Sequence, residues 1–184
     1  MLIVEGPDGA GKSTLVEKFE AAMGVTREPR SVTSDAESLV PLGDYIVTEL
    51  EKGYGNRIYD RFALISSPHY SMLPNPTFRA PMTDLKWLSE QWVALTLVDP
   101  HFVVCLPPFD VAWANVKDDP KNQVVQDHFF AIYTAYQNFV ASASHFLSIW
   151  VWDYTEGVDP DYFVQRVLRF HYDRMDREAG RRRG

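Results

Sequence analysis

The chain has 184 residues, of which 46% are hydrophobic and 23% are charged, and its formal net charge is −7. This length fits one domain with a sizeable core, and the balance of apolar and charged residues argues against a disordered chain. The negative charge excludes a protein coated with basic residues for non-specific nucleic-acid binding.

Short apolar runs alternate with segments of helical spacing along the chain. In chain order, strands are expected at residues 2–4, 57–60, 101–106 and 146–152. Helices are expected at residues 13–23, from 35 with interruptions at Pro41 and Gly43, and at 62–70, 83–97, 110–116, 124–144 and 159–178. Loops or extended segments are expected at residues 25–33, 73–81 and 117–122. The alternation predicts a single-domain, three-layer α/β fold with a central parallel sheet.

Neither a secretion signal nor a membrane span is expected from the apolar runs. Residues 2–4 are apolar, but acidic Glu5 follows them at once, and no other run approaches the roughly 18 residues that a span needs. The single cysteine, Cys105, excludes an internal disulfide and lies in an apolar run typical of a buried strand. We therefore expect a cytoplasmic protein without a membrane partner.

A glycine-rich motif lies between the first predicted strand and the first predicted helix. Residues 6–13 read Gly-Pro-Asp-Gly-Ala-Gly-Lys-Ser, which matches the Gly-x-x-x-x-Gly-Lys-Ser pattern of a P-loop. Glycines let backbone N–H groups approach phosphate oxygens, Lys12 reaches the β- and γ-phosphates, and the Ser13 hydroxyl ligates Mg²⁺. The motif predicts a kinase that binds ATP and Mg²⁺. The expected nucleotide contacts are Gly6, Pro7, Asp8, Gly9, Ala10, Gly11, Lys12, Ser13 and Thr14.

A second polar motif, Asp60-Arg61, follows the predicted strand at residues 57–60. Ligands of doubly wound sheets collect at the carboxyl ends of the strands. Asp60 is therefore a candidate for catalysis and Mg²⁺ binding, and Arg61 can clamp a phosphate through two parallel hydrogen bonds. The neighbouring rings of Phe62 and Tyr70 are candidates for stacking on an acceptor base.

A third motif, Arg27-Glu28-Pro29, follows the extended segment and supplies candidate acceptor contacts in Arg27 and Glu28. A hydroxyl acceptor benefits from a positioned carboxylate, whereas a phosphate acceptor needs no base. Asp8, Glu28 and Asp60 are the available carboxylates, and the sequence leaves open which of them faces the acceptor.

Taken in order, these motifs resemble the thymidylate kinase family. The resemblance covers about the first 70 residues: Val4 to Thr14, Arg27-Glu28-Pro29, Asp60-Arg61-Phe62, Ser66-Ser67 and Tyr70. It implies ATP as donor and a pyrimidine nucleotide as acceptor, and it places adenine near residues 152–155. The segment at residues 60–70 also resembles small phage-encoded members, some of which phosphorylate 5-hydroxymethyluracil already built into DNA.

The chain departs from that family in its arginines. Thymidylate kinases supply a transition-state arginine from the P-loop or the lid. The P-loop here has no basic residue before Lys12, and the only basic residues at positions 107–127 are Lys117 and Lys121. Charge on the transferred group still requires a cation. The candidates are Arg57, Arg61 and Arg79 elsewhere in the chain, or one of the two lysines, Lys117 and Lys121.

The C-terminal region is basic, with seven arginines against four acids after Asp159, a balance of +3. Arg166, Arg169, Arg174 and Arg177 form a stripe on the last predicted helix, which could contact a DNA backbone or be an ordinary solvated face. We divide the chain into a kinase domain at residues 1–178 and a basic tail at residues 179–184.

Three functions follow from these observations. The first is phosphorylation of 5-hydroxymethyluracil in DNA, a step of thymidine hypermodification. The second is phosphorylation of dTMP or another deoxynucleoside monophosphate, and the third is nucleotide binding without turnover. The sequence leaves open whether the chain forms a homodimer.

Overall fold

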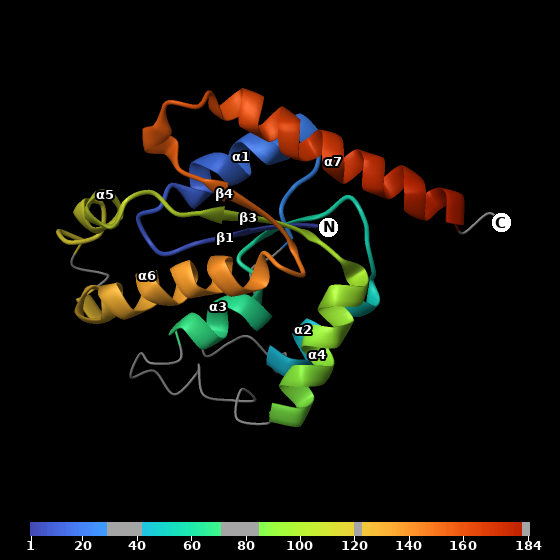
Figure 1. The fold of residues 1–184 in the computed structure, drawn as a ribbon, viewed down its shortest axis with the longest axis horizontal. Coiled ribbons are helices and arrows are strands. Elements are labelled where there is room, and N and C mark those ends of the chain that lie inside the picture. The colour runs from blue at the N-terminus through green and yellow to red at the C-terminus, as the bar shows by residue number, and fades with distance from the viewer. Residues whose placement is uncertain (29–41, 71–84, 120–122, 182–184) are drawn as a thin grey trace.

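The computed structural model describes residues 1–28, 42–70, 85–119 and 123–181 (Figure 1). Within these residues the strands form one parallel sheet in the order β2-β1-β3-β4. The strands are β1 (Leu2–Glu5), β2 (Ile58–Asp60), β3 (His101–Cys105) and β4 (Ser148–Trp152). Glu28, which lies outside the named strands, forms an isolated parallel bridge with Tyr59 of β2. Because all strands are parallel, their carboxyl ends share one edge, as ligand binding in this fold class requires.

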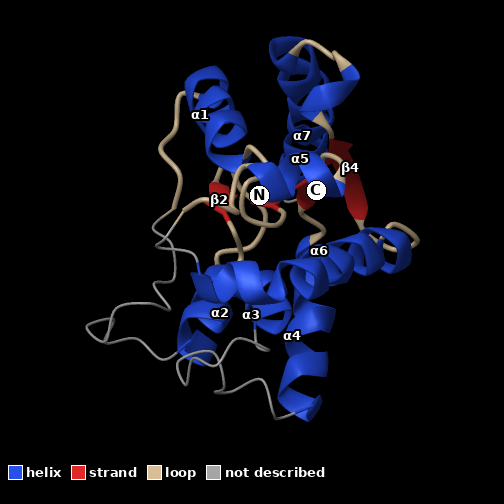
Figure 2. Cartoon of the chain, turned by 90° about the vertical axis from the view of Figure 1, so that its left-hand side faces the viewer, coloured by secondary structure: helices blue, strands red, loops and turns tan. Residues whose placement is uncertain are grey.

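Helices cover both faces of the sheet, so the strands lie between two helical layers (Figures 1 and 2). One layer contains α1 (Lys12–Met23) and α7 (Pro160–Arg181). The other contains α2 (Leu42–Glu51), α3 (Ala63–Tyr70), α4 (Leu85–Val98) and α6 (Gln123–Ala143). Helix α5 (Phe109–Ala114) follows β3, and the short 3₁₀ helix η3 (Tyr154–Glu156) follows β4.

Alternation along the strands divides the core into two clusters. Ile3, Phe102 and Val104 pack with the layer that contains α6, whereas Val4 and Val103 pack with α1 and α7. Strands that are apolar on both faces are typical of parallel sheets. The three-layer architecture predicted from the sequence is therefore confirmed.

Helix α1 shows how the sequence ends its elements. Leu15, Phe19 and Met23 recur every four residues and are buried, so one side of the helix faces the sheet. Gly24 follows in the left-handed conformation and its N–H group donates to the carbonyl of Glu20, which satisfies one of the last free carbonyls of the helix.

Most element bounds lie within two residues of the expectation, and two differences matter for the fold. Helix α2 runs through Gly43, because Ile46 and Leu50 are buried four residues apart and fix the helix on the core. Helix α7 continues beyond Glu178 to Arg181, so the structure extends regular helix into the expected tail. The expected start of the second helix at residue 35 and the loop at residues 73–81 lie outside the described residues. Within the described part of the chain, every helix is too short or too polar for a membrane span.

Candidate functional site

The P-loop joins β1 to α1 at the edge where the strands end. Gly6 and Gly9 have φ angles of 138° and 73°, which side chains disfavour. A Cβ atom on Gly6 would overlap the carbonyl of Cys105, and one on Gly9 would overlap the carbonyl of Ala112. Glycine is therefore required at both positions, for conformation and for close packing of the loop on β3 and α5.

The loop encloses a cavity of about 400 Å³ at the N-terminus of α1. Its lining residues are Asp8, Gly9, Gly11, Lys12, Ser13, Thr14, Arg61 and Asn115. Backbone N–H groups at a helix N-terminus attract anions, because the helix dipole places partial positive charge there. Two cationic side chains reinforce this potential, so the cavity suits a polyphosphate. Six of the P-loop residues predicted from the sequence thus line the cavity together with Arg61, whereas the buried Gly6, Pro7 and Ala10 are not among its lining residues.

Lys12 is buried, with 7% of its surface exposed. Its ammonium donates a hydrogen bond of 2.5 Å to the carbonyl of Pro7. Burial, together with the nearby charge of Arg61, lowers the pKa of Lys12 to about 8. Transfer of this hydrogen bond from Pro7 to a phosphate would give the ammonium a full counter-charge.

Arg61 lies against the P-loop carboxylate of Asp8. Its guanidinium is 2.5 Å from Oδ1 of Asp8 and lies over the ring of Tyr70, 4.6 Å from the ring centroid. The Tyr70 hydroxyl donates to Oδ2 of Asp8 at 3.0 Å, and burial raises the pKa of Tyr70 so that it keeps its proton. The three side chains form one charged cluster beside the phosphate cavity. Arg61 has a φ angle of 71°, an unusual value for a residue other than glycine.

Asp60 and Arg27 form a separate ion-pair group. Asp60 is 1% exposed, and its Oδ2 atom is 3.1 Å from the guanidinium of Arg27, which also pairs with Glu20 at 2.9 Å. Asp60 is not among the residues that line the phosphate cavity, whereas the exposed Ser13 is. Ser13 therefore fits a Mg²⁺ ligand, and the structure gives Asp60 an ion-pair partner.

The other acceptor candidates are not gathered at the P-loop. The carboxylate of Glu28 lies 3.8 Å from the ammonium of Lys52 on the α2 side. Phe62 is fully buried and packs edge-on against Tyr59, so its ring is a core residue rather than a stacking surface. Arg79 lies outside the described residues.

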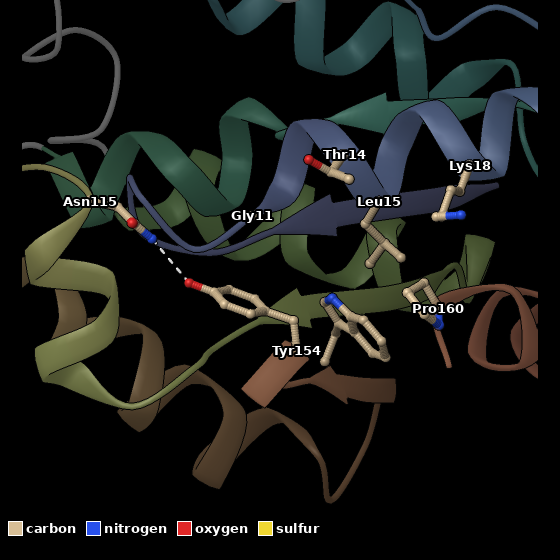
Figure 3. A pocket seen from close by; sticks show the side chains of 8 residues that line it. Gly11, Thr14, Leu15, Lys18, Asn115, Tyr154 and Pro160 are labelled. Carbon is tan, nitrogen blue, oxygen red and sulfur yellow. Dashed lines mark hydrogen bonds between the residues drawn. The ribbon is translucent and has the colours of Figure 1, made fainter. Parts of the chain in front are cut away.

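A second cavity, of about 330 Å³, adjoins the first and shares Gly11, Thr14 and Asn115 with it. Its other lining residues are Leu15, Lys18, Trp152, Tyr154 and Pro160 (Figure 3). Figure 3 shows Asn115 and Tyr154 pointing toward one another, and the amide of Asn115 donates to the Tyr154 hydroxyl at 3.0 Å and to the Gly9 carbonyl at 2.9 Å. A cavity with ring walls beside a phosphate site suits a nucleobase. The sequence pointed to residues 152–155 but not to Asn115, which carries no motif.

Two arginines of α7 have partners within the chain. Arg174 pairs with Asp99 and Glu178, and Arg166 lies over the ring of Trp150 at 5.4 Å from its centroid. Helix α7 also lies in the α1 layer, across the sheet from α3 (Figure 2). These contacts account for both side chains without nucleic acid.

Comparison with solved structures identifies the fold. The YorR protein from Bacillus subtilis, solved in complex with phosphorylated GDP, aligns with a TM-score of 0.66 and 17% identity over 92% of this chain and 94% of that one. Deoxyadenosine kinase from M. mycoides aligns with a TM-score of 0.61 and 15% identity in its dATP complex, over 91% of this chain and 98% of that one. Its dCTP complex aligns with a TM-score of 0.59 and 17% identity, over 92% and 99%.

The chain has the P-loop kinase fold. No model of a protein family matches the sequence, and no curated protein matches it. At 15–17% sequence identity, the similarity to these solved structures establishes the architecture alone. The substrates of the protein must therefore be argued from the site itself.

Proposed function

We propose that the protein is an ATP-dependent kinase that transfers a phosphoryl group to a hydroxyl of a pyrimidine deoxynucleoside acceptor. One observation carries this proposal: among the described residues, Lys12, Ser13, Arg61 and one carboxylate, Asp8, line the same cavity at the N-terminus of α1. The adjoining cavity with Tyr154 offers room for the donor base.

The side chains divide the work of phosphoryl transfer, which depends on positioning and charge stabilisation. Lys12 and the backbone N–H groups of the P-loop hold the donor phosphates. Mg²⁺, when bound by Ser13 and the phosphates, neutralises charge on the donor. Arg61 is the arginine nearest the P-loop in the described residues, and its guanidinium can stabilise the negative charge on the phosphoryl group in the transition state. It thereby takes the place of the arginine that the P-loop itself lacks.

Asp8 favours a hydroxyl acceptor over a phosphate acceptor. A carboxylate repels an acceptor that is already anionic, whereas it can accept the proton of an attacking hydroxyl. In that step the acceptor oxygen bonds to the γ-phosphorus, the bond to the ADP oxygen breaks, and the hydroxyl proton passes to Asp8. Arg61 and Tyr70 orient the carboxylate through its two oxygens.

Among hydroxyl acceptors, we infer that the 5-hydroxymethyl group of 5-hydroxymethyluracil in DNA is the substrate. The resemblance of residues 60–70 to phage-encoded kinases supports this acceptor. The solved neighbours that are deoxyadenosine kinases favour a second candidate, a free deoxynucleoside. The thymidylate-kinase-like motifs favour dTMP as the remaining alternative.

The test is a transfer assay with γ-labelled ATP and matched acceptors. The acceptors are a duplex with 5-hydroxymethyluracil, the same duplex with thymine, a set of free deoxynucleosides, and dTMP. The proposal predicts label in the 5-hydroxymethyluracil duplex and none in the thymine duplex. Label only in free deoxynucleosides would show that the acceptor is a free deoxynucleoside and not 5-hydroxymethyluracil in DNA. Label only in dTDP would contradict the role given to Asp8.

A further inference from the structure

Glu5 is a buried acid that the mechanism above does not use. It is the last residue of β1, directly before the P-loop, and its exposed fraction is 0%. Both oxygens are hydrogen-bonded: the backbone N–H of Phe62 donates to Oε1 at 2.6 Å, and the hydroxyl of Tyr136 donates to Oε2 at 2.9 Å. A carboxylate in the interior requires such partners, because burial of an unpaired charge is costly.

These bonds fix the turn that carries Arg61. The backbone N–H of Arg61 donates to the carbonyl of Val4 at 2.9 Å, and the next N–H, that of Phe62, donates to Glu5. Two successive backbone groups are therefore tied to the end of β1. A left-handed conformation at Arg61 persists only where the surroundings impose it. The Glu5 carboxylate supplies one of the two constraints that impose it.

The second oxygen of Glu5 ties this turn to α6. Tyr136 belongs to that helix, and its ring stacks on the ring of His69 from α3 at a centroid distance of 4.4 Å. One carboxylate thus connects the P-loop strand, the Arg61 turn and helix α6. A change in the charge or geometry of Glu5 therefore affects the strand, the turn and the helix together.

The charges around Glu5 link it to both phosphate-binding cations. Burial raises the pKa of Glu5 to about 7, and the bonds from Phe62 and Tyr136, with the charges of Arg61 and Lys12, oppose that rise. Burial also raises the pKa of Tyr136 and of Cys105 on β3, so both stay neutral. The titratable and charged groups that face Glu5 are Lys12, Arg61, Tyr136 and Cys105, with Asp8 and Tyr70 beyond Arg61.

We propose that Glu5 is a positioning residue that holds the Arg61 turn against the P-loop and so places the Arg61 guanidinium for phosphoryl transfer. The inference rests on the proposed function for its kinetic consequence. Its structural consequence, the placement of Arg61, does not depend on which acceptor is used.

The variant Glu5→Gln tests this placement, because glutamine has the same shape and no charge. Glu49→Gln is the matched control: Glu49 is 6% exposed and accepts a hydrogen bond of 2.6 Å from Tyr59, but it belongs to α2, away from the P-loop. We expect kcat to fall about 10- to 100-fold in Glu5→Gln, since small displacements of a positioned group cost that much. The KM for ATP should change less than about 3-fold. The control should change neither constant.

The pH profile separates positioning from a general loss of structure. In the wild type, kcat should fall on the acid side near pH 7, as Glu5 becomes protonated, and Glu5→Gln should lack this limb. Tyr136→Phe removes a hydrogen bond that favours the ionised form, so the limb should move to higher pH. This second variant decides the question if Glu5→Gln fails to fold.

An NMR measurement tests the inference without reference to activity. The Nε–H resonance of Arg61 should shift in Glu5→Gln, or in Tyr136→Phe at pH 7 if the first variant does not fold, and should not shift in Glu49→Gln. An unchanged Arg61 resonance, or equal losses of kcat in Glu5→Gln and Glu49→Gln, would overturn the proposal. If the wild type labels no acceptor, the proposed function is wrong. The Nε–H resonance of Arg61 would still decide whether Glu5 places its side chain.

Discussion

Replacement of Lys12 by methionine should stabilise the protein while abolishing its activity. The ammonium is buried, and burial lowers its pKa from 10.5 to about 8. Each pKa unit corresponds to about 1.4 kcal/mol, so keeping this charge inside the folded protein costs about 3 kcal/mol. Loss of the hydrogen bond to Pro7 offsets about 1–2 kcal/mol of that gain. The net increase in the free energy of unfolding at pH 7 should be about 1–2 kcal/mol.

Urea unfolding at two pH values checks this reasoning. The pKa of Lys12 is lower in the folded than in the unfolded chain, so the penalty is complete below pH 8 and disappears as the pH rises toward 10.5. The advantage of Lys12→Met over the wild type should therefore shrink by about 2 kcal/mol between pH 7 and pH 9.5. Lys86→Met, at a side chain that is 87% exposed, is the control and should change stability by less than about 0.5 kcal/mol. A Lys12→Met protein less stable than the wild type at pH 7 would refute the argument.

Three further predictions concern the P-loop, the buried histidines and Arg61. Gly9→Ala should destabilise the protein by about 1–3 kcal/mol and weaken ATP binding measured by calorimetry, whereas Gly24→Ala, which has a similar φ and open space around it, should cost only about 1 kcal/mol. Burial lowers the pKa of His101 to about 4 and of His171 to about 3, so unfolding takes up protons below pH 6.5, and stability should fall toward pH 4 by up to about 1.4 kcal/mol per pH unit for each histidine. His171→Gln should halve that slope in urea titrations, and an unchanged slope would contradict the assignment. Arg61→Lys should lower kcat by about 100-fold without a comparable loss of thermal stability, because lysine cannot form two parallel hydrogen bonds; a wild-type kcat would exclude Arg61 from phosphoryl transfer.

The parts of the site that follow from local sequence could be predicted. The P-loop is a continuous stretch whose glycines and lysine act through the backbone turn they form, so residues 6–13 point to phosphate binding without tertiary information. The end of β2 could be placed at the same edge because parallel strands align their carboxyl ends. Arg61 was therefore found beside the P-loop, where the structure has it.

Contacts between distant segments could not be predicted in this way. Glu5 meets Tyr136 across 131 positions of the chain, and neither residue belongs to a motif that names the other. An acid at the end of an otherwise apolar strand is the signal that could have drawn attention to it. Phe62 was expected near an acceptor because it follows Arg61, but the turn directs its ring into the core. Sequence neighbours of a site residue need not face the site.

The same limit applies to the arginine stripe of α7. Spacing predicted a basic face, but the ion pair of Arg174 with Asp99 depends on the packing of α7 beside the turn before β3, whereas its pair with Glu178 is local to the helix. Charge patterns show where a cation is along a helix, whereas its partners in other elements are set by tertiary structure.

The most direct measurement of the central claim is transfer of the γ-phosphoryl group to a hydroxyl acceptor under single-turnover conditions. Wild type, Lys12→Ala and Asp8→Asn would each be mixed with labelled ATP and a duplex that contains 5-hydroxymethyluracil. We predict label on the hydroxymethyl oxygen with the wild type, none with Lys12→Ala, and transfer slowed by about 100-fold or more with Asp8→Asn. Full transfer by Lys12→Ala, or label that appears only in dTDP when dTMP replaces the duplex, would contradict the account.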